Sequence, residues 1–434
     1  MYKRSRFNIV IDERYLWNTR TGALATLTAD DLIYYNTFSG IGDDSDLFAL
    51  LKTNKFLIPE EIDELGVLLK QETEIFTDVM PSDLYFVIAP TLNCNYKCEY
   101  CFESQRDIYA DMSEETARDV ICFVERKIIN NDRLKRLHIT FFGGEPLLKI
   151  DILDMLSGQL HEICNRNNIK YRPTIITNGR YIYDDAILIF KRDKFKSVQI
   201  SMDAVGEKYC MIRGASINDF NETIQNIINV SKYMDRVIVR INVRNGEFRD
   251  ARQVVDALFS RSDEKSSLKV YAANVNEGEK DTRLSTHIKY IEGEQQFKAW
   301  VSLCYGSNHY FNKRPLAKGV SCRLSCDSNF GIGPLGELYK CDYHFGKEQY
   351  AVGTVKMGYS DIKRKEFHTI ARHGKEFEKC KECSMVPICM GGCINNKIQG
   401  EKITDCSKFI EQMIRREIDS YTVGKAANVI NDND

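Results

Sequence analysis

The stretch that decides the fold reads Cys94-Asn95-Tyr96-Lys97-Cys98-Glu99-Tyr100-Cys101-Phe102. It directly follows an apolar run at residues 84–90 that is typical of a buried strand. Three thiolates on one tight loop can hold three irons of a cubic [4Fe–4S] cluster and leave the fourth iron open to another ligand. A zinc site with a distant fourth ligand is the alternative that this spacing leaves open.

The cysteine count points the same way as this loop. The chain has 434 residues and 15 cysteines, and we find neither a signal peptide nor an apolar run of bilayer length. Because the cytosol keeps thiols reduced, we expect a cytoplasmic protein whose cysteines bind metal. With 60 Lys and Arg against 62 Asp and Glu, the net charge of −2 argues against nucleic acid or a membrane as a partner.

Around this loop, strand patterns alternate with helical ones. We predict a first helix after Ser113, which would be its N-cap, and a second one around residues 153–163. Six β/α units imply parallel strands with right-handed crossovers, too few for an eight-stranded barrel. The predicted fold class is therefore α/β, a partial (β/α)6 TIM-like barrel. Its strands would be LYFVIAP, LHITFF, PTIIT, SVQISM, RVIVRINV and LKVYAANV.

The rest of the chain is expected to form three further parts. Residues 1–82 would be a small α+β module with two early strands and then a helical stretch over residues 48–72. The barrel would occupy residues 83–300 and a cysteine-rich iron–sulfur domain residues 301–412. Residues 413–434 would be a C-terminal helix and tail.

The cysteine loop resembles the signature of the radical S-adenosylmethionine (SAM) superfamily, in which an aromatic residue, here Phe102, follows the last cysteine. After the second strand, Gly143-Gly144-Glu145-Pro146 resembles the GGEP element of that family, which meets the methionine amino group of SAM. Two glycines would let the backbone approach a ligand closely. The resemblance implies that the catalytic cluster is bound by Cys94, Cys98 and Cys101 and that SAM is contacted by Gly143, Gly144 and Glu145.

Three further residues match SAM contacts of the same family. Ser201 begins Ser201-Met202-Asp203-Ala204, which resembles the family's S-L-D-G segment with Met and Ala as departures. By this resemblance Ser201 contacts the ribose, and Arg213 and Tyr100 also contact the cofactor. A strand-end hydroxyl and a solvent-exposed Arg and Tyr are the alternatives.

The C-terminal cysteines resemble the twin-cluster SPASM domain. They read C-x3-C-x9-G-x4-C and then C-x2-C-x5-C-x3-C, followed by a last cysteine. The resemblance implies one auxiliary cluster on Cys322, Cys326, Cys341 and Cys393 and a second on Cys380, Cys383, Cys389 and Cys406. The expected cofactors are therefore three [4Fe–4S] clusters and SAM, and two zinc knuckles are the alternative.

The four other cysteines have ordinary explanations. We expect Cys122, Cys164 and Cys304 in the core. Cys210 is close to Arg213 in the sequence and has a small chance of facing the active site.

Asp342 directly follows Cys341 in the stretch G-E-L-Y-K-C-D-Y, which resembles anaerobic sulfatase-maturating enzymes. There an Asp at the matching place deprotonates the substrate Cys or Ser, which makes Asp342 a candidate catalytic base. Hydrogen bonding to the cluster loop is the alternative role. The family's reaction cleaves SAM reductively to a 5′-deoxyadenosyl radical that abstracts a substrate hydrogen, so an electron donor such as ferredoxin or flavodoxin is implied.

The N-terminal module is similar in layout to the leader-recognition elements of ribosomal-peptide maturases, which add a leader as a strand at a sheet edge. We therefore expect a radical SAM oxidoreductase that installs a thioether or carbon–carbon cross-link on a precursor peptide. A formylglycine-forming sulfatase maturase is the alternative, and epimerisation is less favoured. An inactive leader-binding or electron-transfer scaffold is the non-enzymatic alternative, against which the intact motifs count.

Overall fold

The computed structural model describes most of the chain, with gaps. The described residues are 1–244, 246–262, 267–275, 284–311, 315–317, 319–371, 375–399, 406, 410, 412–415 and 417–418. The predicted tail therefore lies largely outside them.

The chain forms two compact units. The barrel unit holds Val79–Asn312 and Asp327–Lys365, and the second, here the N/C unit, holds Met1–Asp78, Lys313–Cys326 and Glu366–Asp434. The cysteine-rich segment thus contributes to both units. The four-part division made from the sequence stays a prediction.

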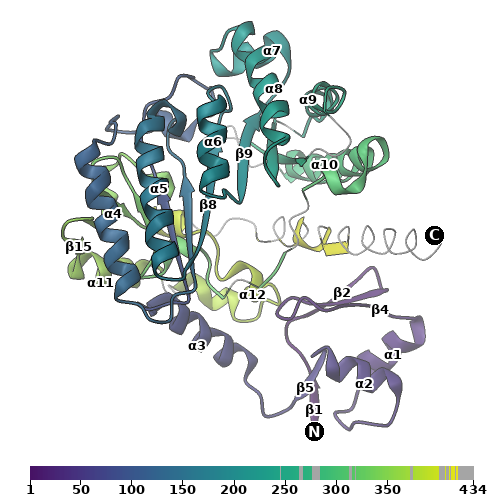
Figure 1. Ribbon diagram of the computed structural model, residues 1–434. Coiled ribbons are helices and arrows are strands. Elements are labelled where there is room, and N and C mark those ends of the chain that lie inside the picture. Colours follow the sequence, from purple (N-terminus) through teal and green to yellow (C-terminus); the bar gives the residue numbers. More distant parts are fainter. Residues whose placement is uncertain are drawn as a thin grey trace. The chain divides into compact units, whose positions relative to one another are not determined.

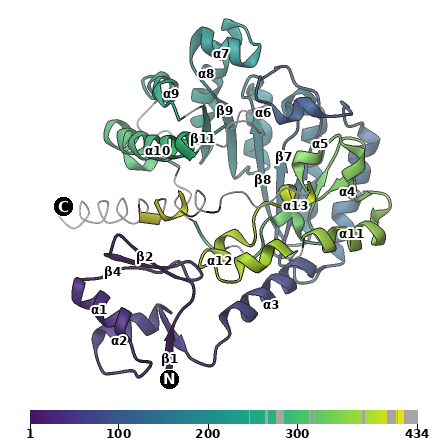
Figure 2. The same ribbon diagram turned by 180° about the vertical axis from the view of Figure 1, so that it is seen from behind.

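Six parallel strands form the wall of the barrel, and each coincides with a run predicted from the sequence. Neighbouring strands pair in sequence order and in parallel throughout, and several of them are seen side by side in Figure 2. The predicted partial barrel is therefore confirmed. The strands are β6 (Asp83–Ile88), β7 (Arg136–Phe141), β8 (Lys170–Thr177), β9 (Ser197–Met202), β10 (Val237–Val243) and β11 (Leu268–Asn274).

Helices cover the outer face of this wall, and α4, α5 and α6 lie side by side on it (Figure 1). As predicted, Ser113 caps α4, where its Oγ accepts a hydrogen bond from the Thr116 N–H at 3.0 Å. Among the described helices, none is long and apolar enough to cross a membrane. The helices of the unit are α4 (Glu114–Ile129), α5 (Ile150–Arg166), α6 (Asp184–Arg192), α7 (Gly206–Arg213), α8 (Ile217–Ser231), α9 (Arg249–Phe259) and α10 (Leu284–Tyr305).

Burial alternates along the strands in the way that a barrel wall requires. In β6, Leu84, Phe86 and Ile88 are buried, and Phe86 packs against Phe123 of α4. The residues between them point to the other side of the sheet, the inside of the barrel. The same alternation runs through β7, β8 and β9. In these four strands the inner face is therefore less buried than the outer one.

The sheet continues beyond β6 with strands from the cysteine-rich segment. β12 (Phe330–Ile332) pairs in parallel with β6, and β13 (Glu337–Tyr339), β14 (Gly353–Thr354) and β15 (Gly358–Tyr359) follow in antiparallel order. Gly336, at φ +86°, lies in the turn between β12 and β13, where a Cβ would come within 3.0 Å of Val355. The sequence did not predict this extension, because strands of two or three residues show no usable periodicity.

The N-terminal part of the N/C unit contains more elements than the sequence predicted. A three-stranded sheet is formed by β2 (Asn8–Ile11), β3 (Tyr15–Asn18) and β4 (Leu24–Thr26), and β1 (Tyr2–Arg4) pairs with β5 (Leu57–Pro59). The helices are α1 (Ala29–Thr37), α2 (Asp46–Thr53) and α3 (Glu64–Thr77).

The continuous helical stretch predicted over residues 48–72 is wrong. α2 ends at its C-cap Asn54, and Lys55 takes a left-handed conformation at φ +63°. Pro59 then lies at the end of β5, so that Lys-Phe-Leu-Ile leads into a strand rather than ending a helix. Apolar spacing alone does not separate a short buried strand from a helical turn.

The N-terminal module shares a core with the C-terminal cysteine region of the same unit. Cys380 and Cys383 lie against this core, and the Ser384 Oγ donates to the Arg6 carbonyl at 2.9 Å. The module therefore supplies part of the wall around two predicted cluster ligands, close to the short helices α12 (Val386–Cys389) and α13 (Ile394–Ile398). The core residues are Phe7, Leu68, Val386 and Met390.

The cysteines outside the motifs follow the predictions only in part. Cys164 is fully buried, as expected. Cys122 and Cys304 are exposed, which makes their core assignment wrong. Each lies on a helix beside buried residues but faces outward, because neighbouring positions of a helix point about 100° apart. Cys210 is half-buried.

Candidate active site

The cluster loop (residues 94–102) follows the carboxyl end of β6, and hydrogen bonds hold the residues directly before it. The Thr91 hydroxyl donates to Asp111 Oδ1 at 2.5 Å and accepts from the Asn93 N–H at 2.9 Å. The Asn93 side chain donates to the same Asp111 oxygen at 2.7 Å. The Thr91 hydrogen bond lowers the pKa of Asp111, so this carboxylate stays ionised and holds the chain directly before Cys94.

The GGEP element (residues 143–146), here called the shelf, lies directly against the cluster loop because its two glycines have no side chains in the way. The N–H groups of Gly144 and Glu145 donate to the carbonyls of Thr91 and Asn93 at 3.1 and 2.9 Å. A Cβ on Gly144 would come within 2.1 Å of the Asn93 carbonyl oxygen, and Gly143 has φ +133°. The glycines therefore allow the shelf backbone to approach the loop that carries Cys94, whereas the sequence had suggested an approach to a ligand.

Glu145 is fully buried at the centre of this shelf. Its Oε1 accepts from the Leu147 N–H at 3.0 Å and from the Thr177 hydroxyl at 2.8 Å, and its Oε2 accepts from the Asn178 N–H at 2.7 Å. Burial raises the pKa of Glu145 to about 7. Oε2 makes one of these bonds and keeps capacity to accept a further donor. Contact with an amino group of SAM stays a prediction.

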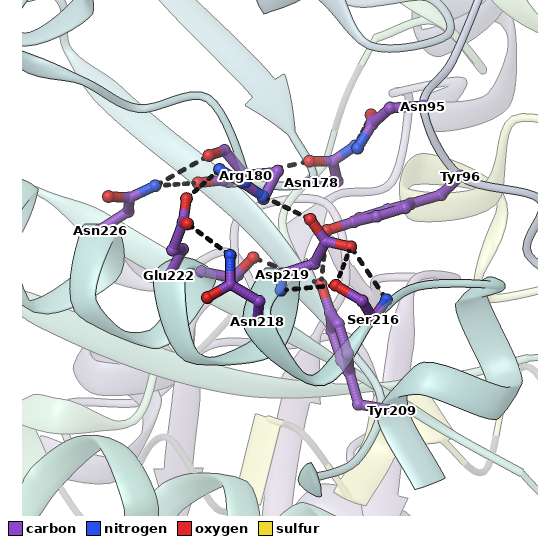
Figure 3. A network of polar contacts seen from close by, with 12 residues as sticks. Asn95, Tyr96, Asn178, Arg180, Tyr209, Ser216, Asn218, Asp219, Glu222 and Asn226 are labelled. Atoms are coloured by element: carbon purple, nitrogen blue, oxygen red, sulfur yellow. Dashed lines mark hydrogen bonds and ion pairs between the residues drawn. The ribbon is translucent and has the colours of Figure 1, made fainter. Parts of the chain in front are cut away.

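A polar network joins the cluster loop to α8 through Asn178 (Figure 3), and the Asn178 N–H also donates to Glu145 of the shelf. The Asn178 Nδ2 donates to Asn95 Oδ1 at 2.7 Å and lies 4.0 Å from Cys94 Sγ. Its Oδ1 accepts from the Arg180 N–H at 3.0 Å, and the Arg180 Nε donates to Asp219 of α8 at 2.6 Å. The sequence analysis missed Asn178. A signal was present in Thr177-Asn178-Gly179 at the carboxyl end of β8, where α/β folds bind ligands.

Arg213 joins two other predicted SAM contacts. Its Nη2 donates to the Ser201 carbonyl at 2.8 Å and reaches the Tyr100 hydroxyl at 3.4 Å. Its Nε donates to Asp203 at 2.6 Å, and Asn242 donates to both Asp203 and the Tyr100 hydroxyl, at 3.0 and 2.9 Å. Arg213 is only 2% exposed, so the solvent-exposed alternative is wrong for this residue. Asp203 and Asn242 were missed by sequence reasoning.

The end of α7 also holds the cluster loop itself. The N–H groups of Lys97 and Glu99 donate to the carbonyls of Arg213 and Ile212 at 2.9 and 3.2 Å. Desolvation by the surrounding protein raises the thiol pKa values of Cys94, Cys98 and Cys101. Metal binding therefore has to displace thiol protons, as it does at thiolate sites generally. Three thiols on one anchored loop fit a cluster with one open iron.

Asp342 lies beside the segment that follows this loop. It begins a short helical turn after β13, and the next residue, Tyr343, stacks on Phe102 with ring centroids 4.5 Å apart. Burial raises the pKa of Asp342. Burial also raises the pKa of Glu103 to about 8, and the charge of Asp342 adds to that shift. A carboxyl group is thus held close to the cluster loop, while its role as a base stays a prediction.

Comparison with known proteins decides the family of this barrel. Residues 88–258 match the Radical SAM superfamily. Residues 88–258 are a radical SAM domain. A cysteine-type anaerobic sulfatase-maturating enzyme of Clostridium novyi is 26% identical over 343 residues, which cover 70% of this chain and 86% of that protein. The radical SAM cyclopropyl synthase TigE of Paramaledivibacter caminithermalis is 36% identical over 101 residues, 20% of this chain and 21% of that one.

Solved structures share the fold at low sequence identity. Native anSMEcpe with bound AdoMet has a TM-score of 0.59 at 18% identity and covers 80% of this chain and 100% of its own. Streptococcus suis SuiB bound to precursor peptide SuiA has a TM-score of 0.54 at 15% identity and covers 92% and 98%. A radical SAM domain works with a [4Fe–4S] cluster and SAM, which the cysteine loop and the GGEP shelf fit.

Outside the radical SAM domain, the N/C unit holds all four cysteines of one predicted ligand set. Burial raises the pKa of Cys380 to about 11, and the charges of Cys389, Cys383 and Cys406 add to that shift. These four are the cysteines of the proposed second auxiliary cluster. Among the described residues, no three His, Cys, Asp or Glu side chains stand at the separations of a bound metal ion. Binding of a cluster by this set stays a prediction.

The first auxiliary set is shared between the two units. Cys322 and Cys326 lie in an apolar cluster with Phe76 of α3, in the N/C unit. Cys393 is exposed at the start of α13 in the same unit. Cys341 belongs to the barrel unit. The assembly of this set therefore stays a prediction.

Proposed function

We propose that this chain is a radical SAM maturase that abstracts hydrogen from a ribosomally made precursor peptide and installs a thioether or carbon–carbon cross-link. The observation that carries the proposal is the folded N-terminal module. The fold match to SuiB, solved with a precursor peptide, spans 92% of this chain, against 80% for anSMEcpe. In the three-stranded sheet, β2 and β4 each pair on one side only among the described strands, and such an edge accepts a leader peptide as an added strand.

In this proposal each part of the site has a distinct task. Cys94, Cys98 and Cys101 would hold the catalytic cluster, which when bound would supply the electron for reductive cleavage of SAM to methionine and the 5′-deoxyadenosyl radical. Glu145 would accept the amino group of SAM, and Ser201, Tyr100 and Arg213 would hold its nucleoside end. The other eight motif cysteines would bind two fully ligated clusters suited to electron transfer, which makes three clusters in all. A reduced ferredoxin or flavodoxin would supply the electron.

A formylglycine-forming sulfatase maturase is the second candidate. The sequence similarity to sulfatase-maturating enzymes over 70% of this chain favours it, together with Asp342. A half-buried carboxylate with a raised pKa is a better base for a substrate thiol than an exposed one.

Release of 5′-deoxyadenosine tests the enzymatic part of the proposal. The reconstituted protein is reduced anaerobically with dithionite in the presence of SAM, and the nucleoside is measured by chromatography. We expect release that the variant Cys98→Ala abolishes. If protein with all of its clusters releases none, the chain is a scaffold and not an enzyme.

The mass of the modified peptide separates the two candidates. A cross-link removes two hydrogens from a precursor, whereas formylglycine formation replaces the thiol group by an aldehyde oxygen. The probes are a Cys-bearing short peptide encoded beside the gene and a sulfatase-derived Cys peptide. Hydrogen exchange in β2 and β4, measured with and without the precursor, shows whether the leader adds to a sheet edge. Deletion of the module is a poor test, because its core residues cover Cys380 and Cys383.

A further inference from the structure

The inner face of the barrel wall is rich in cations. The six strands carry one carboxylate, Asp83, whose oxygens are engaged by Arg136 at 2.8 Å and by His138 at 3.1 Å. Strand alternation and the pairing register place the Lys and Arg side chains of these strands on the same face as Asp83. Apart from Arg136, these cations therefore have no carboxylate on the wall. They are Lys170, Arg172, Arg240 and Lys269.

Arg240 is the cation of this group that stands beside the predicted cofactor residues. It lies on β10, and its Cα is paired with Ser201 of β9 and with Tyr271 of β11. Asn242, two residues further on the same face, donates to the Tyr100 hydroxyl. The Arg240 Nε is buried and has no hydrogen-bond partner among the described residues. A buried donor without an acceptor costs about 1–3 kcal/mol, so an acceptor from a ligand is expected here.

The carboxylate of SAM does not fit this position. Its amino and carboxylate groups share one carbon atom, so both belong near the GGEP shelf after β7. Arg240 stands three strands away, which is about 14 Å at the usual strand spacing. Counted from the shelf, it lies one strand beyond Ser201, the predicted ribose contact. Arg213, the other guanidinium nearby, is already engaged by Asp203 and by the Ser201 carbonyl.

We propose that Arg240 binds a carboxylate of the peptide substrate, the side chain of an Asp or Glu, and so selects acidic segments for modification. The inference rests on the proposed peptide-modifying function. A guanidinium presents a fork of N–H donors that matches both oxygens of a carboxylate, which an ammonium group does not. The anchored carboxylate fixes the register of the peptide beside Ser201, and thus which residue meets the 5′ carbon of the cofactor.

The test compares binding of two short labelled peptide pools to the reconstituted protein with SAM. The pools are randomised except for a Cys next to either Glu or Gln. We expect the wild type to bind the Glu pool about tenfold more tightly and R240Q to lose the preference. R240K should keep a part of it. K170Q, which removes an exposed cation of the same wall at the start of β8, away from Ser201, should keep it fully. Iron content and Tm confirm that the variants are folded.

Two outcomes overturn the inference. Equal binding of both pools by the wild type shows that no carboxylate is selected. A tenfold weaker SAM affinity in R240Q shows that the guanidinium holds the cofactor carboxylate instead. Release of 5′-deoxyadenosine without peptide is measured in the same samples. Its absence would refute the proposed function and leave the binding result readable, so the two failures are distinguishable.

Discussion

The cluster loop of the barrel unit and the C-terminal cysteines of the N/C unit are built differently. The loop is held by Asp111, by the GGEP backbone, by Asn178 and by the end of α7. Around Cys380 and Cys389 there are mainly turns, short helices and an apolar wall supplied by the N-terminal module. The site predicted to leave one iron open is therefore shaped by protein hydrogen bonds. We expect the predicted fully ligated sites to depend more on the metal for their order.

The largest expected effect comes from breaking each region at a cysteine. C98A should lower 5′-deoxyadenosine release by about a thousandfold or more, because the open cluster is lost, yet change Tm by only a few degrees, because the loop remains anchored. C389A should do the opposite: a larger drop in Tm and retention of release within about tenfold. Calorimetry and nucleoside release are measured on both variants. Similar Tm losses in the two would contradict the contrast.

A second break removes one anchor of the cluster loop. G144A places a Cβ 2.1 Å from the Asn93 carbonyl oxygen, a backbone atom that cannot move without the loop. We expect a loss of about 3 kcal/mol or more in the free energy of unfolding and a poorly retained catalytic cluster. G206A is the matched control: its φ is +58°, but nothing lies within 4 Å, so the cost should be about 1 kcal/mol. Urea unfolding and iron analysis measure both.

A third change attacks the wall of the N/C unit. F7A removes a fully buried ring from the core against which Cys380 and Cys383 lie. We expect about 3–4 kcal/mol of destabilisation and loss of iron from the second auxiliary set, with the cluster of the barrel unit retained. I33A, on an exposed position of the same module, should change stability by less than about 0.5 kcal/mol. If F7A keeps its full iron content, the wall is not needed for that site.

The sequence predicted what local patterns encode. All six barrel strands, the Ser113 cap and the position of the GGEP element after the second strand follow from short stretches. Pairings between distant segments were missed, because they leave no periodic trace: β12 beside β6, and the module core around Phe7. The cysteine motifs were found through their spacing.

Polar partners of the site were harder to predict. Asp203, Asn178 and Arg240 lie on strands or directly after them, and single polar residues there look like ordinary ones until their neighbours are known. Their roles depend on which strand lies beside which. A sequence alone shows that they exist, and only the sheet order shows that they meet.

The smallest expected effect is a pH dependence of the free energy of unfolding that comes from the barrel unit and not from the N/C unit. Burial raises the pKa of Glu145 to about 7, above the usual carboxyl value near 4.5, so the folded state holds this proton more tightly than the unfolded chain does. The resulting stabilisation is complete below about pH 4.5 and is lost as pH rises through 7. It amounts to on the order of 3 kcal/mol. The thiol of Cys380, with its pKa raised to about 11, adds no slope in this range.

E145Q should remove that slope. Its amide would set an N–H against the Asn178 N–H, which costs a roughly constant amount at all pH values. Urea unfolding of the metal-free protein between pH 5 and 8 should therefore give a free-energy difference between wild type and E145Q that shrinks as pH rises. The free energy of unfolding of F7A, measured in parallel, should lie below that of the wild type by the same amount at every pH, because no titrating group is changed. Parallel curves for E145Q as well would mean that Glu145 is already ionised throughout, and that the buried shelf holds a carboxylate even before any amino group arrives.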